Sequence, residues 1–188
     1  LPVRLRLPGT YNVYNAVGVI AAAGAMGAGG AAMRRALEGF APAYGRAEEA
    51  RIDGQDLTLL LIKNPTGANE VIRSLAGLDG EQDFLALLND RVADGEDVSW
   101  IWDVDFGRLR PRSLVVSGRR AADMALRLKY AGLDPVRGIA TEADLEAALD
   151  RALAGATGRL YVLTTYTAML EFRGLLVRRG ALREYWRE

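Results

Sequence analysis

Between residues 57 and 163 the sequence alternates short apolar runs with longer helical segments, and this alternation most limits how the chain can fold. The run at 57–62 (LTLLLI) is apolar at nearly every position, which is typical of a strand buried on both faces of a sheet. Further strands are predicted at 84–88, 113–116, 134–139 and 160–163. Helices are predicted at 68–78, 119–131, 142–154 (capped by Thr141) and 164–179. Repeated strand–helix units predict an α/β fold with an open, mostly parallel sheet flanked by helices.

The beginning of the chain follows a different pattern. Residues 1–7 (LPVRLRL) alternate apolar and basic side chains, which predicts an edge strand. A helix is predicted from Tyr11 to about Gly27 or Gly30, and a second, shorter helix at 31–40. The segment 42–49 predicts a linker, and we place a domain boundary there, between 1–44 and 45–188. Because the chain begins with Leu1 in the middle of the alternating pattern, we expect it to be a piece of a longer protein.

The amino-acid composition excludes several kinds of catalytic and binding site. The 188 residues include no cysteine and no histidine, so the chain has no disulfide, no thiolate nucleophile and no imidazole base of its own. Lys plus Arg and Asp plus Glu each total 24, so no net charge would attract nucleic acid or an anionic membrane. The apolar stretch 17–33 is rich in Ala and Gly and is too weakly apolar to predict a transmembrane segment.

Within the segment 87–106 (LLNDRVADGEDVSWIWDVDF), the stretch from Asp90 to Asp103 contains five acidic residues: Asp90, Asp94, Glu96, Asp97 and Asp103. Three roles are open for them. Their spacing lacks the closing glutamate of a calcium-binding loop, so a dedicated metal site is not predicted. One aspartate could orient an imidazole, but that imidazole would have to come from another chain. In the third interpretation, which the residues alone favour, the carboxylates are solvated and make turns around Gly95.

Trp100 and Trp102 stand two positions apart, with Ile101 between them. In a short strand this spacing places the two indoles on one face. Aromatic side chains beside a charged loop either brace that loop or contact a partner.

The turn 63–67 (KNPTG) follows the first buried strand. Lys63, Asn64 and Thr66 offer a cation, an amide and a hydroxyl at a helix N-terminus, a combination that suits a phosphate or a carboxylate. The alternative is a plain helix start, in which Asn64 or Thr66 is the cap and Pro65 sets the turn.

Asn12 and Asn15 are three positions apart, on one face of the first predicted helix. Two amides there suit the edge of a purine. Helix capping is the simpler interpretation for Asn12, but it does not explain Asn15.

Several of these motifs together resemble the Mur ligase family. GTYNVYNAVGVIAAA (9–23) resembles the GxxNxxNxxAAxA element of that family. IKNPTGANEVIR (62–73), the acidic segment and TTYTAML (164–170) resemble the C-terminal domain of one branch, the MurT-type subunit of lipid II isoglutaminyl synthase. The resemblance runs nearly end to end, and NDxxADGxDxSWIWD is its branch-specific part.

The resemblance implies a Rossmann-like domain, preceded by a strand and two helices that end a central ATPase domain. It implies a bacterial, cytoplasmic enzyme at the inner face of the membrane, which amidates D-glutamate of the lipid II stem peptide to D-isoglutamine. ATP with Mg²⁺ would activate the carboxylate, and a GatD-type glutaminase subunit with a Cys and a His would supply ammonia. The Gly-rich ATP loop, the magnesium ligands and the cysteine cluster of a central-domain zinc site are absent from this chain. We therefore expect the fragment alone to be inactive.

The resemblance also implies roles for single residues. Asp97 would complete the Cys–His site of the partner as its third member. Asn12 and Asn15 would contact adenine, and Lys63, Asn64 and Thr66 would face the substrate cleft. A third group would support the loop or the partner interface: Asp90, Asp94, Trp100 and Trp102. The alternatives are a non-catalytic docking module for a glutaminase and a Mur ligase that adds an amino acid.

Overall fold

The structure is a computed structural model that describes residues 2–5, 9–40, 46–133 and 138–183. The strands are β1 (Arg46–Ile52), β2 (Gln55–Leu61), β3 (Gln82–Leu87), β4 (Pro111–Ser117), β5 (Ile139–Thr141) and β6 (Leu160–Thr164). The α-helices are α1 (Thr10–Ala25), α2 (Gly30–Gly39), α3 (Pro65–Ala76), α4 (Ala121–Tyr130), α5 (Leu145–Gly155) and α6 (Tyr166–Arg178). Short 3₁₀ helices, η1 (Val92–Asp94), η2 (Ser99–Asp103) and η3 (Phe106–Arg108), lie between β3 and β4.

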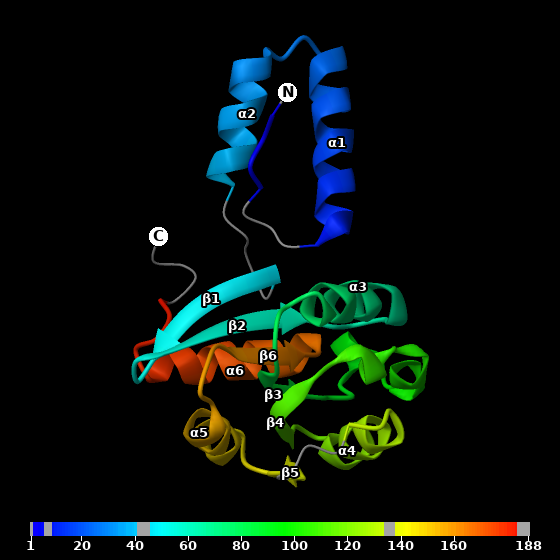
Figure 1. Cartoon of the computed structure of the whole chain (residues 1–188), viewed down its shortest axis with the longest axis vertical. Coiled ribbons are helices and arrows are strands. Elements are labelled where there is room, and N and C mark those ends of the chain that lie inside the picture. Colours follow the sequence, from blue (N-terminus) through cyan, green and yellow to red (C-terminus); the bar gives the residue numbers. More distant parts are fainter. Residues whose placement is uncertain (1, 6–8, 41–45, 134–137, 184–188) are drawn as a thin grey trace.

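The described strands form one six-stranded sheet in the order β1-β2-β6-β3-β4-β5, with helices on both faces (Figure 1). β2, β6, β3, β4 and β5 pair in parallel, and only β1 runs antiparallel to its neighbour. The predicted open, mostly parallel α/β sheet is therefore confirmed.

The sheet separates two apolar layers. On one face, α3, α4 and the 3₁₀ segment pack side chains such as Ile72, Phe106 and Met124 against the strands. On the other face, α5 and α6 pack side chains such as Leu149 and Phe172. Every residue of β3 is buried because this strand lies inside the sheet with both faces covered. That burial explains why the strands lack polar alternation.

β1 corrects the predicted linker at 42–49. Residues 46–49 belong to an antiparallel edge strand, and 42–45 lie outside the described residues. Asp53 and Gly54, with φ of 50° and 81°, form the turn that joins β1 to β2. An Asp-Gly pair is a frequent two-residue hairpin turn because both positions need positive φ. The strand was missed because its polar, glutamate-rich sequence is that of an exposed sheet edge.

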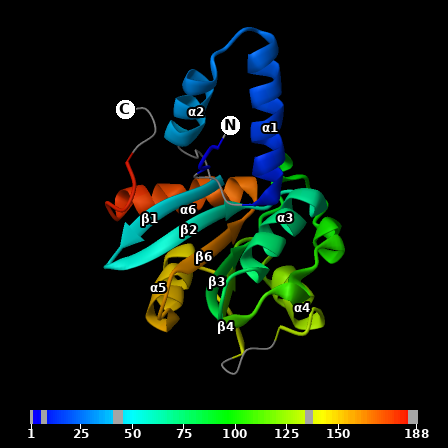
Figure 2. The ribbon, with the colours of Figure 1, turned by 45° about the horizontal axis from the view of Figure 1, so that its top comes forward.

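The two predicted N-terminal helices are present as α1 and α2, which form a hairpin that projects from the α/β body (Figures 1 and 2). Residues 2–5 form no strand, so the edge-strand prediction for 1–7 is wrong there, and positions 1, 6 and 7 lie outside the described residues. α2 has no buried residue, and α1 exposes Val13, Tyr14 and Val17. The division into 1–44 and 45–188 stays a prediction.

Other predicted boundaries shift by a few residues. α5 is capped by Asp144, whose Oδ1 accepts a hydrogen bond from the backbone N–H of Ala147 at 2.8 Å. Thr141, the predicted cap, belongs instead to β5. The predicted strand at 134–139 falls largely on 134–137, outside the described residues, and β5 begins at its last position. Among the described helices, none combines the length and apolar character needed to cross a membrane.

Gly118 permits the tight approach between the β4–α4 turn and the end of β3. Its φ is +99°, and a Cβ at this position would lie 2.5 Å from the carbonyl oxygen of Leu88. We expect Gly118→Ala to lower the free energy of unfolding by about 2–4 kcal/mol, measured by urea denaturation. Gly132→Ala is the control, because Gly132 has φ +79° with open space around it, and should cost about 1 kcal/mol. Equal costs at the two positions would contradict the predicted clash.

Candidate functional site

Asn89 joins three elements at the edge where β3, β4 and β6 end. It is 1% exposed. Its backbone N–H donates to Thr165 Oγ1 (3.0 Å), and its side-chain amide donates to Thr167 Oγ1 (3.1 Å) and Glu171 Oε2 (3.3 Å). Its Oδ1 accepts from the backbone N–H of Arg119 at 3.0 Å. The end of β3 is thus tied to the turn after β4 and to the start of α6. The edge lies at the carboxyl ends of parallel strands, where α/β sheets bind ligands.

Asp90 fastens the beginning of the acidic loop to the start of α4. Its two carboxylate oxygens accept from Arg119 Nε (2.8 Å) and Arg120 Nη1 (3.3 Å). The hydrogen bond from Arg119 is the largest cause that holds the pKa of Asp90 below its ordinary value of 3.8, and Arg120 adds to it. Asp90 is therefore an ionised anchor of the loop.

Asp94 fastens the same loop to α6. Its carboxylate accepts from the backbone N–H of Thr167 at 2.7 Å and from the hydroxyl of the same residue. Arg91 pairs with Glu171 at 2.7 Å and reinforces this contact. Among the described residues, no group of three or more acidic side chains is arranged to hold a metal ion. The carboxylates of Asp90 and Asp94 act within the fold.

Asp97 differs from these anchors because it is exposed and forms no ion pair with any described residue. Its Oδ1 accepts a hydrogen bond from the backbone N–H of Ser99 at 2.7 Å. This hydrogen bond is the largest cause that lowers the pKa of Asp97. The loop thus presents one oriented, ionised carboxylate to its surroundings.

The two tryptophans do not share a strand face, so that prediction is wrong. They lie in the 3₁₀ helix η2, where three residues complete a turn and positions 100 and 102 point in different directions. Ile101 is fully buried, and Trp100 is partly buried against the core. Trp102 is 50% exposed and packs against the ring of Tyr130 (centroids 5.8 Å apart) and the guanidinium of Arg127 (5.5 Å). Trp100 braces the loop, whereas Trp102 belongs to a surface.

The turn at 63–67 begins α3. Asn64 is the N-cap, and its Oδ1 accepts from the backbone N–H of Gly67 at 2.8 Å, with Pro65 as the first helical residue. The helix-cap alternative is therefore confirmed for Asn64. Lys63 and Thr66 are exposed. Their contact with a substrate stays a prediction.

The two N-terminal amides lie in different environments. Gly9 is the N-cap of α1, so Asn12 is not the N-cap residue of this helix. Asn12 is buried at 9% exposure, while Asn15 is exposed. A nucleotide contact by either residue stays a prediction.

A cavity of about 350 Å³ adjoins Asn89 on the face covered by α5 and α6. Ser117, Arg119, Leu145 and Glu171 are among its lining residues. The hydroxyl of Ser117 is buried without a hydrogen-bond partner. The sequence signals part of this edge, because the polar turns 89–97 and 117–119 each follow a predicted strand directly, whereas it gives no such signal for Leu145 and Glu171.

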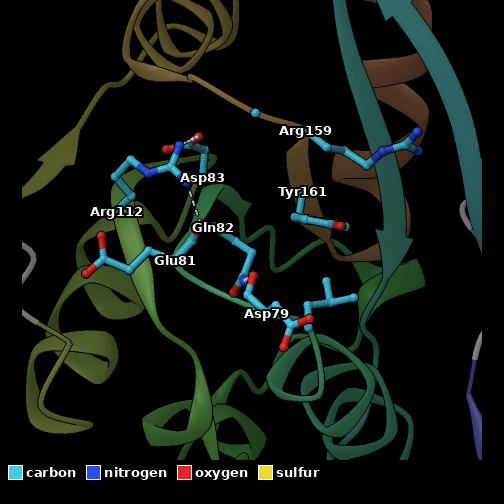
Figure 3. Close-up of a pocket in the computed structure, with 9 residues that line it drawn as sticks. Asp79, Glu81, Gln82, Asp83, Arg112, Arg159 and Tyr161 are labelled. Atoms are coloured by element: carbon cyan, nitrogen blue, oxygen red, sulfur yellow. Dashed lines mark hydrogen bonds and ion pairs between the residues drawn. The ribbon is translucent and has the colours of Figure 1, made fainter.

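A pocket of about 270 Å³ lies at the opposite edge, where β3, β4 and β6 begin, and its lining residues are drawn in Figure 3. Its most buried acid, Asp83, accepts hydrogen bonds from Ser113 Oγ (2.7 Å), Arg112 (3.1 Å) and the backbone N–H of Thr157 (3.0 Å). These bonds hold neighbouring strand ends together. No residue predicted for a site lines this pocket.

The anchoring role of Asp90 predicts a pH dependence. Because the pKa of Asp90 is lowered in the folded state, its stabilising contribution is complete above pH 3.8 and is lost as the pH falls through the lowered value. In urea denaturation, the stability difference between wild type and Asp90→Asn should be constant from about pH 7 to 5 and should shrink below about pH 4. Asp105→Asn, which removes an exposed pair with Arg108, should change stability little at any pH. A difference for Asp90→Asn that grows in acid would contradict this assignment.

The chain is similar in sequence to proteins of known family. The family described as MurT ligase C-terminal matches residues 61–169. The MurT subunit of lipid II isoglutaminyl synthase (glutamine-hydrolysing) from Streptococcus pneumoniae is 35% identical over 183 residues, which are 96% of this chain and 41% of that protein. The chain therefore spans about two fifths of this relative.

Solved structures show the same fold at lower identity. The UDP-N-acetylmuramate–alanine ligase MurC of Thermotoga maritima is 16% identical, with a TM-score of 0.68 over 96% of this chain and 40% of that chain. The folylpolyglutamate synthase of Mycobacterium tuberculosis, solved with ADP, is 22% identical, with a TM-score of 0.65 over 92% of this chain and 41% of that chain. The family match and the sequence relative show that this chain belongs to the MurT branch of the Mur ligase family.

Proposed function

We propose that this chain is part of the synthetase subunit of an ATP- and glutamine-dependent amidotransferase, which converts D-glutamate of the lipid II stem peptide to D-isoglutamine. The similarity to the MurT subunit of lipid II isoglutaminyl synthase supports the reaction, and the fold shared with Mur ligases is consistent with it. In this function ATP activates the carboxylate of the substrate, and ammonia then displaces phosphate. The reaction takes place in the bacterial cytoplasm, at the inner face of the membrane.

The observation that carries the proposal is Asp97. A carboxylate that is exposed, ionised and oriented by the Ser99 N–H lies in a chain without histidine or cysteine. Such a group completes a Cys–His site only if another chain brings those two residues. A glutaminase subunit of the GatD type would supply them. Asp97 would then accept the ring N–H of the partner's imidazole, fix its tautomer and stabilise its protonated form while the thiolate attacks the glutamine amide.

The rest of the chain serves the ligase reaction in this proposal. Asn15 and Asn12, on α1, contribute to the adenine side of the ATP site. Lys63 and Thr66 face the cleft that receives the activated glutamate, and Asn64 shapes that cleft by capping α3.

The metal ions belong elsewhere in the parent protein. We assign the ligands for Mg²⁺ and for a zinc ion to the central domain, as the resemblance to the Mur ligase family implies. We expect the present residues alone to be inactive as a ligase.

Asp97→Asn in the parent protein, assembled with its glutaminase, tests the proposal. The amide keeps the size of the side chain but cannot hold the imidazolium, so we expect glutamine hydrolysis to fall by about 10³–10⁴-fold with partner binding unchanged. Glu96→Gln, which neutralises the exposed neighbouring acid, should leave hydrolysis unchanged. Wild-type hydrolysis by Asp97→Asn would refute the proposed role.

A second candidate, a docking module without a catalytic contribution, is favoured by one surface. Trp102 and Tyr130 are 50% and 73% exposed and stack edge to face, and Leu126 beside them is 48% exposed. Exposed aromatic residues of this kind often anchor protein interfaces.

The aromatic surface generates its own prediction. Trp102→Ala with Tyr130→Ala should weaken binding of the glutaminase by about tenfold or more in calorimetric titration, because both rings lose contact area. Tyr14→Ala, which removes an exposed ring from α1, is the control and should leave binding unchanged. Unchanged binding by the double variant would exclude this surface from the interface. A docking module would show weakened binding here but normal hydrolysis in Asp97→Asn.

A further inference from the structure

The loop that carries Asp97, residues 90–98, leaves the apolar core at Leu88 and returns to it at Val98. Leu88 and Ile101 are fully buried and Val98 is 7% exposed. The stretch between Asp90 and Asp97 has no apolar anchor, because η1 contains no buried residue and Val92 is 84% exposed. Polar contacts therefore fix the direction in which the chain approaches Asp97.

Thr167 lies at the centre of these polar contacts. Its backbone N–H donates to Asp94 Oδ1 at 2.7 Å, and its hydroxyl donates to Asp94 Oδ2. The same hydroxyl oxygen accepts from the side-chain amide of Asn89 at 3.1 Å. Asp94 in turn accepts from the backbone N–H of Arg91 at 3.1 Å. One hydroxyl thus connects the loop to the buried end of β3.

Asp94 also completes the N-terminus of α6. The N-cap residue of this helix, Thr165, makes no side-chain cap, because its hydroxyl accepts from the backbone N–H of Asn89 instead. A carboxylate at a helix N-terminus satisfies unpaired N–H groups and interacts favourably with the helix dipole. Asp94 provides this contact from the loop, so the cap of α6 and the position of the loop depend on one another.

α6 is a firm support for that contact. Ala168, Met169 and Phe172 are buried in the layer beneath the sheet. Arg173 forms a bidentate pair with Glu48 of β1, at 2.8 and 2.9 Å, with both side chains about 15% exposed. The first turn of α6 is therefore held in place by the core and by the sheet edge, and it can serve as a reference position for the loop.

We propose that Thr167 and Asp94 are positioning residues for Asp97, which hold the Asp97 carboxylate in the direction that the imidazole of the partner requires. This inference rests on the proposed function. Neither residue touches the reacting atoms, and each acts by fixing the loop. Displacement of a catalytic group by about 1 Å can cost up to about 10²-fold in rate. Since Val98 still anchors the far side of Asp97, we expect a partial loss.

Thr167→Val and Thr167→Ser form the matched pair that tests this proposal. Valine keeps the shape of threonine without the hydroxyl, whereas serine keeps the hydroxyl without the methyl group. In the parent protein with its glutaminase, Thr167→Val should lower kcat for glutamine hydrolysis by about tenfold. Its KM for glutamine and its affinity for the partner should stay within about twofold of wild type, as should every parameter of Thr167→Ser.

A second variant and a local measurement support the kinetic test. Asp94→Ala removes the same contact from the loop side and should reduce kcat at least as much as Thr167→Val. Asp105→Asn, which removes an exposed pair within the same β3–β4 connection, should leave kcat unchanged. Amide hydrogen exchange over residues 91–97 should accelerate in Thr167→Val and Asp94→Ala but not in Thr167→Ser.

The outcomes separate the two proposals. Wild-type kcat in both Thr167→Val and Asp94→Ala would overturn the positioning role while leaving Asp97 in place. Equal losses of kcat in Thr167→Val and Thr167→Ser would assign the effect to packing and would also overturn the positioning role. A loss of partner affinity without a loss of kcat would overturn it as well. Normal hydrolysis by Asp97→Asn would instead refute the proposed function on which the inference rests.

Discussion

The buried amide of Asn89 is the contact on which the candidate site depends. Three elements distant in sequence meet at this side chain: the end of β3, the turn into α4 and the first turn of α6. A buried amide is costly unless its hydrogen-bonding groups are paired, so these elements must adopt one mutual arrangement. Gly118 belongs to the same constraint, because the backbone there passes too close to Leu88 for any side chain. The acidic loop starts from this fixed point.

The aspartates of the acidic loop have different roles, and the hydrogen-bond partners of each carboxylate set its role. Asp90 and Asp94 are paired to arginine and to a helix N-terminus, which fixes them within the fold. Asp97 is oriented by one backbone N–H and remains open to solvent. The same residue type therefore serves as an anchor at two positions and as an accessible ionised group at a third. This division is what makes a shared site with another chain a physically coherent proposal.

Elements with strong local signals were predictable from the sequence, and those with weak ones were not. Buried parallel strands are apolar throughout, so β2, β3, β4 and β6 could be located to within a few residues. β1 was missed because it lies at a sheet edge, where polar side chains resemble those of a linker. Trp100 and Trp102 were predicted to share one face of a short strand because they stand two positions apart, but they lie in a 3₁₀ helix, Ser99–Asp103, in which Ile101 is buried.

The sequence by itself determined the open, mostly parallel α/β sheet with its flanking helices, the acidic loop after β3 and the absence of any imidazole or thiol. Local patterns are sufficient for these features. A strand buried on both faces is apolar at successive positions, and the residue types present are read directly from the sequence. Only the tertiary structure decided which aspartates are held by distant parts of the fold, as Asp90 and Asp94 are, and which one, Asp97, stays exposed with a local hydrogen bond. Thr167 lies 73 positions from Asp94, and no local pattern records that contact. It exists because parallel strands bring their carboxyl ends to one edge, so residues far apart in the chain become hydrogen-bond partners.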